Sequence, residues 1–391
     1  MDLLTAGDPV PRRRLLLGLA GIGVGGLAAG RLAAAGRGRL EAARPPRPGG
    51  EIWSSGAGGG AFYNFAAAGG IVCFAASAGS GTAAGPLQAL RARDGAAVWR
   101  SAAGGGAAYT PAVAGDVVCF GGYDGRLHAL RLADGWPSWS SGAGGGPVTD
   151  PVTAGATAYF GSYDGRLYAL RAADGSPAWS SGAGGGPEIN PVAARGVVYF
   201  GGRDLRLYAL RGADGALLWS SGGGAFGAGP AVISGVVCVG GNDSQLHGLR
   251  AADGALLWSS DAGGGPATAL ASSAGAVYFG GHDRRLHALR AADGAPLWNS
   301  SAGGGQYTGP VAAGGAVYFG GRDLRLYALR AAGGAGLWSS GAGGGPTGAT
   351  PVVAAGVIYF GSFDNRMYAL AAEAGQATID WGSGGGGTAA G

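Results

Sequence analysis

The residues that could bind a ligand stand at variable positions of a forty-residue pattern. Nine to eleven residues after each regularly spaced tryptophan, the side chains differ from unit to unit, and Asp150, Glu188 and Asn190 form the only acid and amide cluster there. Their polar atoms could hydrogen-bond a ligand or a protein partner. The other candidate contacts at these positions are Tyr63, Asn64, Tyr109 and Tyr307. Ordinary sequence drift in loops is the alternative explanation of this variation.

The cysteines, histidines and glycine triplets recur at fixed positions of the pattern, which is typical of structural residues. Cys73, Cys119 and Cys238 stand where other units have tyrosine, so we expect buried free thiols that lie in different units. Three of the four histidines also replace tyrosine, which does not indicate a metal cluster. The glycine triplets lack the Lys-Ser/Thr pair of a phosphate-binding loop. We therefore expect no catalytic, metal-binding or cofactor-binding residues.

Aspartates also recur, each two residues before an arginine in most units, as in Asp124 and Arg126 or Asp164 and Arg166. A carboxylate in such a turn accepts local backbone N–H groups, and the arginine is placed to pair across strands. These residues are therefore interpreted as turn residues.

Tryptophan sets the period of the pattern. Nine of the ten tryptophans (53, 99, 139, 179, 219, 258, 298, 338 and 381) follow one another at intervals of 39 to 46 residues, most often 40. A fixed period of this length indicates a repeat architecture. In one unit, β-type runs at 151–154, 157–161, 166–171 and 176–180 are separated by Gly and Asp-Gly turns. Each unit is therefore predicted to be a four-stranded antiparallel meander.

Repeated meanders of about forty residues predict an all-β fold, a β-propeller. The tryptophans bound eight intervals, so we expect eight blades with a tryptophan packed between neighbours. The last unit, 349–370, has three clear strands. Its fourth is predicted from 51–55, which closes the ring by pairing the first and last segments; 378–381 is the alternative. Because the innermost strands of propellers line the central channel, the variable residues could ring its mouth.

The composition alone leaves the class of protein open. The chain has 391 residues, of which 88 are Gly and 19 are Pro, as in low-complexity chains. However, 47% of the residues are hydrophobic and 13% are charged, whereas disordered chains combine low hydrophobicity with high charge. Glycine does not recur at every third position, which excludes collagen. The fixed positions of glycine in the repeat identify it as a turn residue.

The basic charge of the chain lies in its N-terminal segment. Residues 1–50 carry a net charge of +5, which leaves −1 for the rest, and the chain contains no lysine, so nucleic acid is not expected as a partner. Residues 1–35 combine the arginine run 12–14, a weakly apolar stretch and an Ala-x-Ala site, the parts of a twin-arginine-like export signal. An uncleaved membrane anchor is the alternative. We expect an Arg/Pro/Gly linker at 36–50, the propeller at 51–382 and a Gly-rich tail at 383–391.

The repeat Val-Tyr-Phe-Gly-Gly/Ser-x-Asp-x-Arg-Leu-Tyr-Ala-Leu-Arg-Ala-Ala-Asp-Gly-x-x-x-Trp resembles the pyrroloquinoline-quinone-like β-propeller repeat over nearly all of 51–381. Quinoprotein dehydrogenases of this family hold their quinone and calcium with acids, amides and often two adjacent cysteines, and no adjacent pair occurs here. Seven arginines stand where the family often has Asp, and six aspartates where it often has Thr (Arg91, 131, 171, 211, 250, 290 and 330; Asp94, 134, 174, 214, 253 and 293). Their recurrence indicates a reworked blade contact.

Together with the predicted export signal, the resemblance implies an exported, extracytoplasmic and non-enzymatic scaffold that binds an envelope or extracellular protein or a small ligand. It is similar to the propeller lipoprotein of outer-membrane barrel assembly and to the sensor propellers joined to bacterial Ser/Thr kinases. We expect a monomer that contacts the membrane only through its N-terminal segment. The enzyme alternative is a quinone-dependent dehydrogenase, whose cofactor, pyrroloquinoline quinone, is implied by the resemblance alone.

Overall fold

The computed structural model describes residues 46–56, 62–76, 85–222, 226–306 and 308–372. These residues belong to the second of two units, Pro45–Gly391. The predicted export signal at 1–35 and the predicted tail at 383–391 lie outside the described residues. Where the structure is described, no helix has both the length and the hydropathy that a membrane crossing needs.

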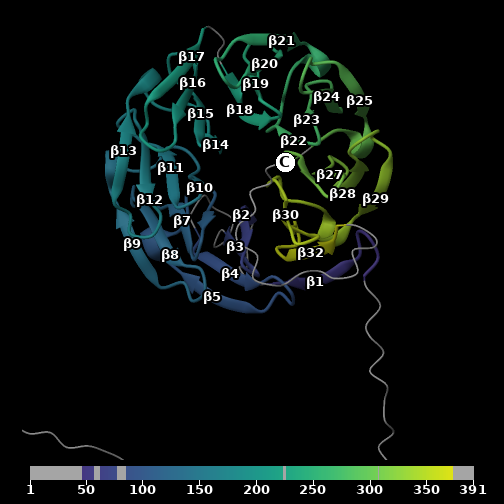
Figure 1. Ribbon diagram of the computed structural model, residues 1–391. Coiled ribbons are helices and arrows are strands. Elements are labelled where there is room, and N and C mark those ends of the chain that lie inside the picture. Colours follow the sequence, from purple (N-terminus) through teal and green to yellow (C-terminus); the bar gives the residue numbers. More distant parts are fainter. Residues whose placement is uncertain (1–45, 57–61, 77–84, 223–225, 307, 373–391) are drawn as a thin grey trace, which may run out of the picture. The chain divides into compact units, whose positions relative to one another are not determined.

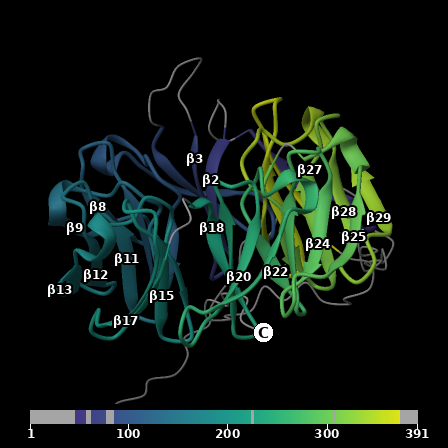
Figure 2. The ribbon, with the colours of Figure 1, turned by 90° about the horizontal axis from the view of Figure 1, so that it is seen from above.

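The strands form eight antiparallel sheets of four strands, arranged as blades around a central axis (Figures 1 and 2). Figure 1 shows the first strand of a blade, such as β10 or β14, nearest the axis and the fourth, such as β13, at the rim. This arrangement confirms the predicted all-β, eight-bladed propeller. The strands of the unit predicted at 151–180 begin and end within one or two residues of the expected limits.

The strands of blades 1 to 4 are β2 (Phe62–Ala68), β3 (Ile71–Ala76), β4 (Leu87–Arg91) and β5 (Ala97–Ser101); β6 (Ala112–Ala114), β7 (Val117–Gly121), β8 (Leu127–Arg131) and β9 (Pro137–Ser141); β10 (Val152–Ala154), β11 (Thr157–Gly161), β12 (Leu167–Arg171) and β13 (Pro177–Ser181); β14 (Val192–Ala194), β15 (Val197–Gly201), β16 (Leu207–Arg211) and β17 (Leu217–Ser221). Those of blades 5 to 8 are β18 (Phe226–Ile233), β19 (Val236–Gly241), β20 (Leu246–Arg250) and β21 (Leu256–Ser260); β22 (Ala271–Ser273), β23 (Ala276–Gly280), β24 (Leu286–Arg290) and β25 (Pro296–Ser300); β26 (Val311–Ala313), β27 (Ala316–Gly320), β28 (Leu326–Arg330) and β29 (Gly336–Ser340); β30 (Val352–Ala354), β31 (Val357–Gly361), β32 (Met367–Ala371) and β1 (Glu51–Ser55). Six short 3₁₀ turns each contain the first two glycines of a triplet: η1 (Ala103–Gly105), η2 (Ala143–Gly145), η3 (Ala183–Gly185), η4 (Ala262–Gly264), η5 (Ala302–Gly304) and η6 (Ala342–Gly344).

The N-terminal strand β1 completes the eighth blade. It pairs antiparallel with β32, so that Trp53 lies opposite Ala369 and Ser55 lies opposite Met367. Closure of the ring by the first strand, as predicted, is therefore confirmed. The alternative strand at 378–381 lies outside the described residues.

The contacts that close the ring begin before β1. The Gly49 N–H donates to Ala371 O (2.8 Å), and the Ala371 N–H donates to Gly50 O (3.0 Å). Gly49 has a φ of +68°, and a Cβ placed on it would lie 2.7 Å from the ring of Trp338. The propeller therefore extends N-terminal of the boundary predicted at 51, into the segment expected as a linker.

Each described tryptophan of the repeat joins its blade to the next. The Trp53 indole donates to Ala92 O in the following blade (2.7 Å), and the same bond recurs around the ring. The ring also covers the glycine of the next Asp-Gly turn, since a Cβ on Gly95 would lie 2.5 Å from Trp53. Trp53 further packs on Tyr359, with ring centroids 5.9 Å apart. The predicted role of tryptophan between blades is confirmed.

The second and third strands of the blades carry the core. Phe160 and its equivalents are fully buried, and the Phe160 ring stacks on Tyr168 at 5.7 Å. The three cysteines lie on such strands and are buried and free, as predicted. Burial raises the pKa of Cys119 and of Cys238 to about 12 and raises the pKa of Cys73 as well. At neutral pH all three are therefore unreactive thiols.

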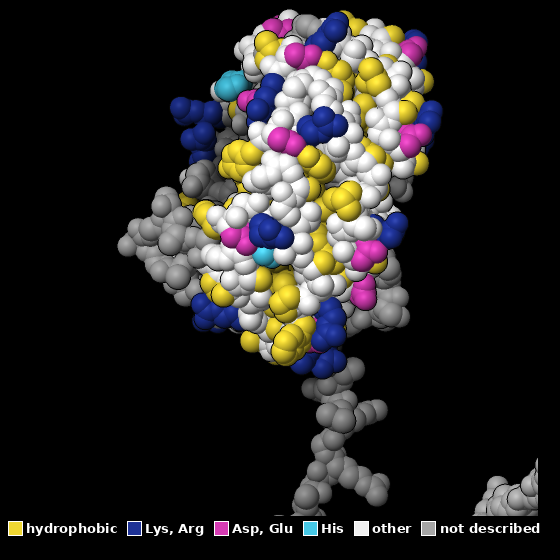
Figure 3. Space-filling model, turned by 90° about the vertical axis from the view of Figure 1, so that its left-hand side faces the viewer, with side chains coloured by type: hydrophobic (Ala, Val, Ile, Leu, Met, Phe, Trp, Pro, Cys, Tyr) yellow, Lys and Arg dark blue, Asp and Glu magenta, His cyan; other side chains and the backbone are white. Residues whose placement is uncertain are grey.

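The recurring acids and arginines lie in turns and on the rim. Asp124 Oδ1 accepts the backbone N–H of Arg126 (3.1 Å), and the Arg126 guanidinium crosses to Ser140 Oγ (3.3 Å). In the turn between the third and fourth strands of a blade, the Arg171 guanidinium forms an ion pair with Asp174 (3.1 Å). Because such pairs repeat from blade to blade, basic and acidic side chains intermingle over the side of the ring in Figure 3. The predicted turn roles are confirmed.

Candidate functional site

Two sets of loops form one face of the ring, which we call the loop face. The first set follows the outer strands and contains the glycine triplets, and the second joins the second and third strands of each blade. Backbone bridges connect the two sets, as between Pro147 and Ser162 or Pro266 and Gly281. Glycine is required here, because a Cβ on Gly144, whose φ is +65°, would lie 2.2 Å from Ser162 Oγ. The predicted contact residues belong to the first set or to the start of β2.

Asp150 and Asn190 form a polar ladder that links three neighbouring blades. Asp150 Oδ1 accepts the backbone N–H of Thr110 (2.7 Å), and Asn190 Oδ1 accepts the backbone N–H of Asp150 (2.9 Å). The Asn190 amide donates in turn to Asp150 Oδ2 (2.6 Å). Each bond spans forty residues and so connects equivalent positions of adjacent blades. Both oxygens of Asp150 are thereby engaged in holding the blades together.

Glu188 lies two residues from Asn190 but pairs elsewhere. Its Oε2 is 3.7 Å from Arg203 Nε, and the two side chains are 61% and 45% exposed respectively. An ion pair this exposed contributes about 0–1 kcal/mol. The structure therefore separates Glu188 from the ladder and leaves it accessible on the loop face.

Tyr109 lies close enough to Tyr123 and Tyr163, on the loop face of blades 2 and 3, for both to affect its pKa, and we call these three residues the aromatic cluster. Burial raises the pKa of Tyr109 to about 12, and interactions with Tyr163, Asp150 and Tyr123 add to this shift. Tyr123 is 57% exposed and Tyr163 is 64% exposed. The cluster therefore presents two accessible phenol rings beside a partly buried one.

Tyr123 and Tyr163 are absent from the residues predicted as contacts. The signal that could have found them is the variable residue before each recurring aspartate. This position holds Tyr123, Tyr163, Arg203, Asn242, His282, Arg322 and Phe363 in successive blades. Among the predicted contacts, the side chains of Tyr63 and Asn64 and the whole of Tyr307 lie outside the described residues.

The histidine–aspartate pairs on this face correspond to tyrosine–aspartate hydrogen bonds in other blades. His128 Nε2 lies 2.9 Å from Asp124 Oδ2, and at the same position of the next blade the Tyr168 hydroxyl donates to Asp164 Oδ2 (2.6 Å). Imidazole therefore takes the place of a phenol that ties the turn. Within the described part of the chain, no three His, Cys, Asp or Glu side chains gather as metal ligands.

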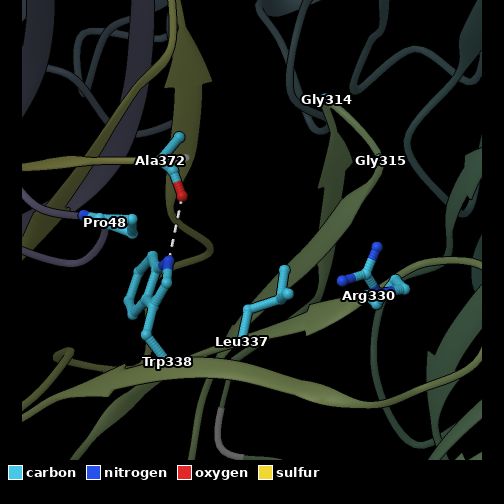
Figure 4. Close-up of a pocket in the computed structure, with 7 residues that line it drawn as sticks. All are labelled: Pro48, Gly314, Gly315, Arg330, Leu337, Trp338 and Ala372. Atoms are coloured by element: carbon cyan, nitrogen blue, oxygen red, sulfur yellow. Dashed lines mark hydrogen bonds between the residues drawn. The ribbon is translucent and has the colours of Figure 1, made fainter. Parts of the chain in front are cut away.

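A cavity of about 480 Å³ opens on the face opposite the loop face, at the junction of blades 7 and 8 (Figure 4). Trp338 and Leu337 line it, and the Trp338 indole donates to Ala372 O (3.0 Å). Arg330 also lines this cavity. Each of its six equivalents has an aspartate three residues later, but Gly333 stands at this position after Arg330.

A second cavity, of about 330 Å³, lies on the loop face at the junction of blades 6 and 7. Its polar lining comes from two turns and two loops: Thr268, His282, Arg284, Gln306 and Arg322. None of these residues was predicted as a contact. Unlike the aromatic cluster, this part of the face is basic.

The blades, the interblade tryptophans and the repeat motif define the class of protein as a pyrroloquinoline-quinone-like β-propeller. A family model described as outer membrane protein assembly factor BamB matches residues 18–141, 83–222 and 221–386. The chain therefore belongs to this family. No curated protein sequence matches the chain.

Several solved structures share the fold. BamB from Moraxella catarrhalis is 20% identical, with 84% of this chain and 99% of that chain covered and a TM-score of 0.65. The computationally designed Ika8 protein is 16% identical, with 82% and 98% covered and a TM-score of 0.68. A quinohemoprotein alcohol dehydrogenase from Pseudomonas putida is 14% identical, with 84% and 77% covered and a TM-score of 0.61. At these identities the likeness establishes the fold.

Proposed function

We propose that the chain is a non-enzymatic scaffold of the cell envelope that binds a protein through the aromatic cluster of Tyr109, Tyr123 and Tyr163. The observation that carries the proposal is the exposure of Tyr123 (57%) and Tyr163 (64%) on neighbouring blades of one face. Tyrosine is enriched at protein interfaces because its ring buries a large area while its hydroxyl remains hydrogen-bonded. The cluster has the composition of an interface anchor.

The backbone holds these tyrosines in place. The Tyr163 N–H donates to Gly146 O (3.2 Å), and the Tyr123 N–H donates to Gly106 O (3.4 Å), so both turns are tied to the preceding glycine loop. A surface that is ordered before binding loses less conformational entropy when the partner docks. The backbone bonds that fix the two turns support a docking role for the cluster.

Membership of the BamB family supports placement in the envelope and a protein as partner. BamB carries the description of an outer membrane protein assembly factor, and an assembly protein of that membrane is the class of partner we propose here. Export by the segment 1–35 is part of the same proposal.

Quinone-dependent dehydrogenation is the alternative that the likeness to the quinohemoprotein suggests. Calcium takes six to eight oxygen ligands, often from carboxylates, and no three Asp, Glu, His or Cys side chains gather among the described residues. The Asp150 carboxylate and the Asn190 amide are hydrogen-bonded to each other and to backbone N–H groups. These residues do not fit a calcium–quinone pair, so we derive no quinone chemistry.

The test compares partner capture by two matched variants. Tyr123→Asn with Tyr163→Asn places at both positions the residue that blade 5 has there, Asn242, and should preserve the turns. Loss of two interface anchors is expected to weaken capture of the envelope partner on the order of 10-fold or more. Affinity purification from membrane extracts, with quantification of the retained partner, measures this effect.

The control is Trp136→Ala, which removes a 65% exposed aromatic in a turn between third and fourth strands, away from the loop face. Most other units have alanine at this position, so the fold should be unaffected. Equal capture by the double tyrosine variant and the control would refute the proposed docking surface.

A further inference from the structure

The cavity between blades 6 and 7 is lined by one amide group and two guanidinium groups that have no partner among the described residues. We propose that it is a binding site for an oxyanion, either a carboxylate or a phosphate group. The site is separate from the aromatic cluster, and the proposal is independent of the protein-binding function.

Gln306 is the residue that breaks the repeat at this place. Pro147, Pro187, Pro266 and Pro346 occupy its position in other blades. Gln306 is only 6% exposed, and its Nε2 has no hydrogen-bond partner among the described residues. Buried amide groups are almost always hydrogen-bonded, because a lost bond to water has to be replaced. The amide therefore requires an acceptor in the cavity that it lines.

The orientation of the Gln306 amide follows from its neighbours. The Thr268 hydroxyl accepts the Gly280 N–H (2.9 Å), and its proton lies between two acceptors, Ala269 O at 3.2 Å and Gln306 Oε1 at 3.5 Å. A Cβ on Gly280 would lie 2.0 Å from Gln306 Oε1, so this glycine makes room for the amide. The nitrogen is thus the end without a partner.

Arg284 and Arg322 bring positive charge to the same cavity from two different blades. Arg284 lies in the turn between β23 and β24, and Arg322 lies in the turn between β27 and β28. Within the described part of the chain, neither guanidinium has an ion pair or a hydrogen bond. Rim arginines such as Arg290, in contrast, pair with the aspartate three residues later.

The carboxylates next to these arginines accept hydrogen bonds from groups of their own turns and of the strands that follow them. Asp283 Oδ1 accepts the Arg285 N–H (3.0 Å) and lies 3.0 Å from His287 Nε2. Asp323 accepts the hydroxyl of Tyr327 and the backbone N–H of Arg325. The charged residues that line the cavity are Arg284 and Arg322, whereas Asp283 and Asp323 are not among its lining residues.

These groups define the chemistry of the ligand. Guanidinium groups and the amide nitrogen only donate hydrogen bonds, so the ligand must supply acceptors. Arginine matches the planar oxygen pairs of carboxylate and phosphate groups, and charge-assisted bonds to them are the stronger ones. A volume of about 330 Å³ accommodates such a group with ordered water.

Isothermal titration calorimetry of the full chain tests the proposal, with inorganic phosphate and with N-acetyl-glutamate amide at constant ionic strength. The variant Gln306→Pro installs the residue of four other blades, and Arg284→Asn with Arg322→Tyr installs residues of the equivalent turns (Asn365, Tyr123). We expect Gln306→Pro to raise Kd on the order of 10-fold and the double arginine variant on the order of 100-fold.

Arg195→Gly is the matched control, because it removes one positive charge from the turn between β14 and β15, where other units have Gly155 or Gly115. Its Kd should stay within about 2-fold of the unaltered chain, since distant exposed charges are screened. Near-ultraviolet circular dichroism confirms that each variant is folded.

Tighter binding of phosphate would identify a phosphate ligand, and tighter binding of the glutamate amide would identify an acidic side chain; both support the site. No binding of either probe to the unaltered chain, or binding that Gln306→Pro leaves unchanged, would overturn it. No protein partner takes part in this titration, so its failure would leave the proposed docking surface standing.

Discussion

Trp53→Ala is expected to lower the free energy of unfolding by about 3–5 kcal/mol, the range typical of large aromatic residues removed from a core. Trp53 is 8% exposed, packs on Tyr359 with ring centroids 5.9 Å apart and donates to Ala92 O (2.7 Å). It lies on β1, so its loss weakens the blade that closes the ring as well as the contact with blade 1. Urea unfolding followed by circular dichroism measures the change.

Two controls separate packing from the hydrogen bond. Trp53→Phe keeps an aromatic ring and removes the indole donor, so a loss of about 1 kcal/mol is expected. Trp136→Ala removes a tryptophan that is 65% exposed, and it should change stability by about 0.5 kcal/mol or less. If Trp53→Ala costs no more than Trp136→Ala, β1 does not secure the ring in the way described.

Gly175→Ala is expected to destabilise the protein by about 2–4 kcal/mol, because it combines backbone strain with overpacking. Gly175 has a φ of +69°, and a Cβ there would lie 2.5 Å from the ring of Trp139. The indole would have to move away from the blade interface that it stabilises. Chemical denaturation against the unaltered chain gives the difference.

Gly155→Ala isolates the strain from the clash. Gly155 has a φ of +56°, and a Cβ there would have no atom within 4 Å; Ala274 and Ala355 occupy the equivalent turn position with a φ of +49°. A cost of about 1 kcal/mol or less is expected. Equal losses in the two variants would show that contact with tryptophan does not explain the recurring turn glycine.

The ring was predictable because its determinants repeat. The spacing of tryptophan and of the Asp-Gly turns indicated eight blades, and the missing fourth strand of the last unit indicated closure by 51–55. The role of Gly49 was missed because Arg47-Pro48-Gly49 lacks the Asp-Gly signature. Only its distance of four residues from Trp53, the same as from Gly95 to Trp99, relates it to the repeat.

The candidate site was less predictable because its residues are departures from the repeat. Asp150 and Asn190 stand one period apart, and this offset could have indicated the ladder between adjacent blades. The turns that carry Tyr123 and Tyr163 meet the glycine loops mainly through backbone bonds, together with the hydroxyl of Ser162, and residue types alone do not reveal these contacts. In the sequence, Gln306 differs from its equivalents only in standing where four other blades have proline. That its amide nitrogen has no partner among the described residues can be seen only in the folded structure.

Photo-crosslinking in intact cells tests the central claim, that the loop face of blades 2 and 3 docks an envelope protein. The photoreactive residue p-benzoylphenylalanine replaces Tyr123, Tyr163 or, as the control, Trp136. We predict the same protein adduct from positions 123 and 163 and none from position 136. Adducts from position 136 alone, or none from either tyrosine position, would contradict the claim.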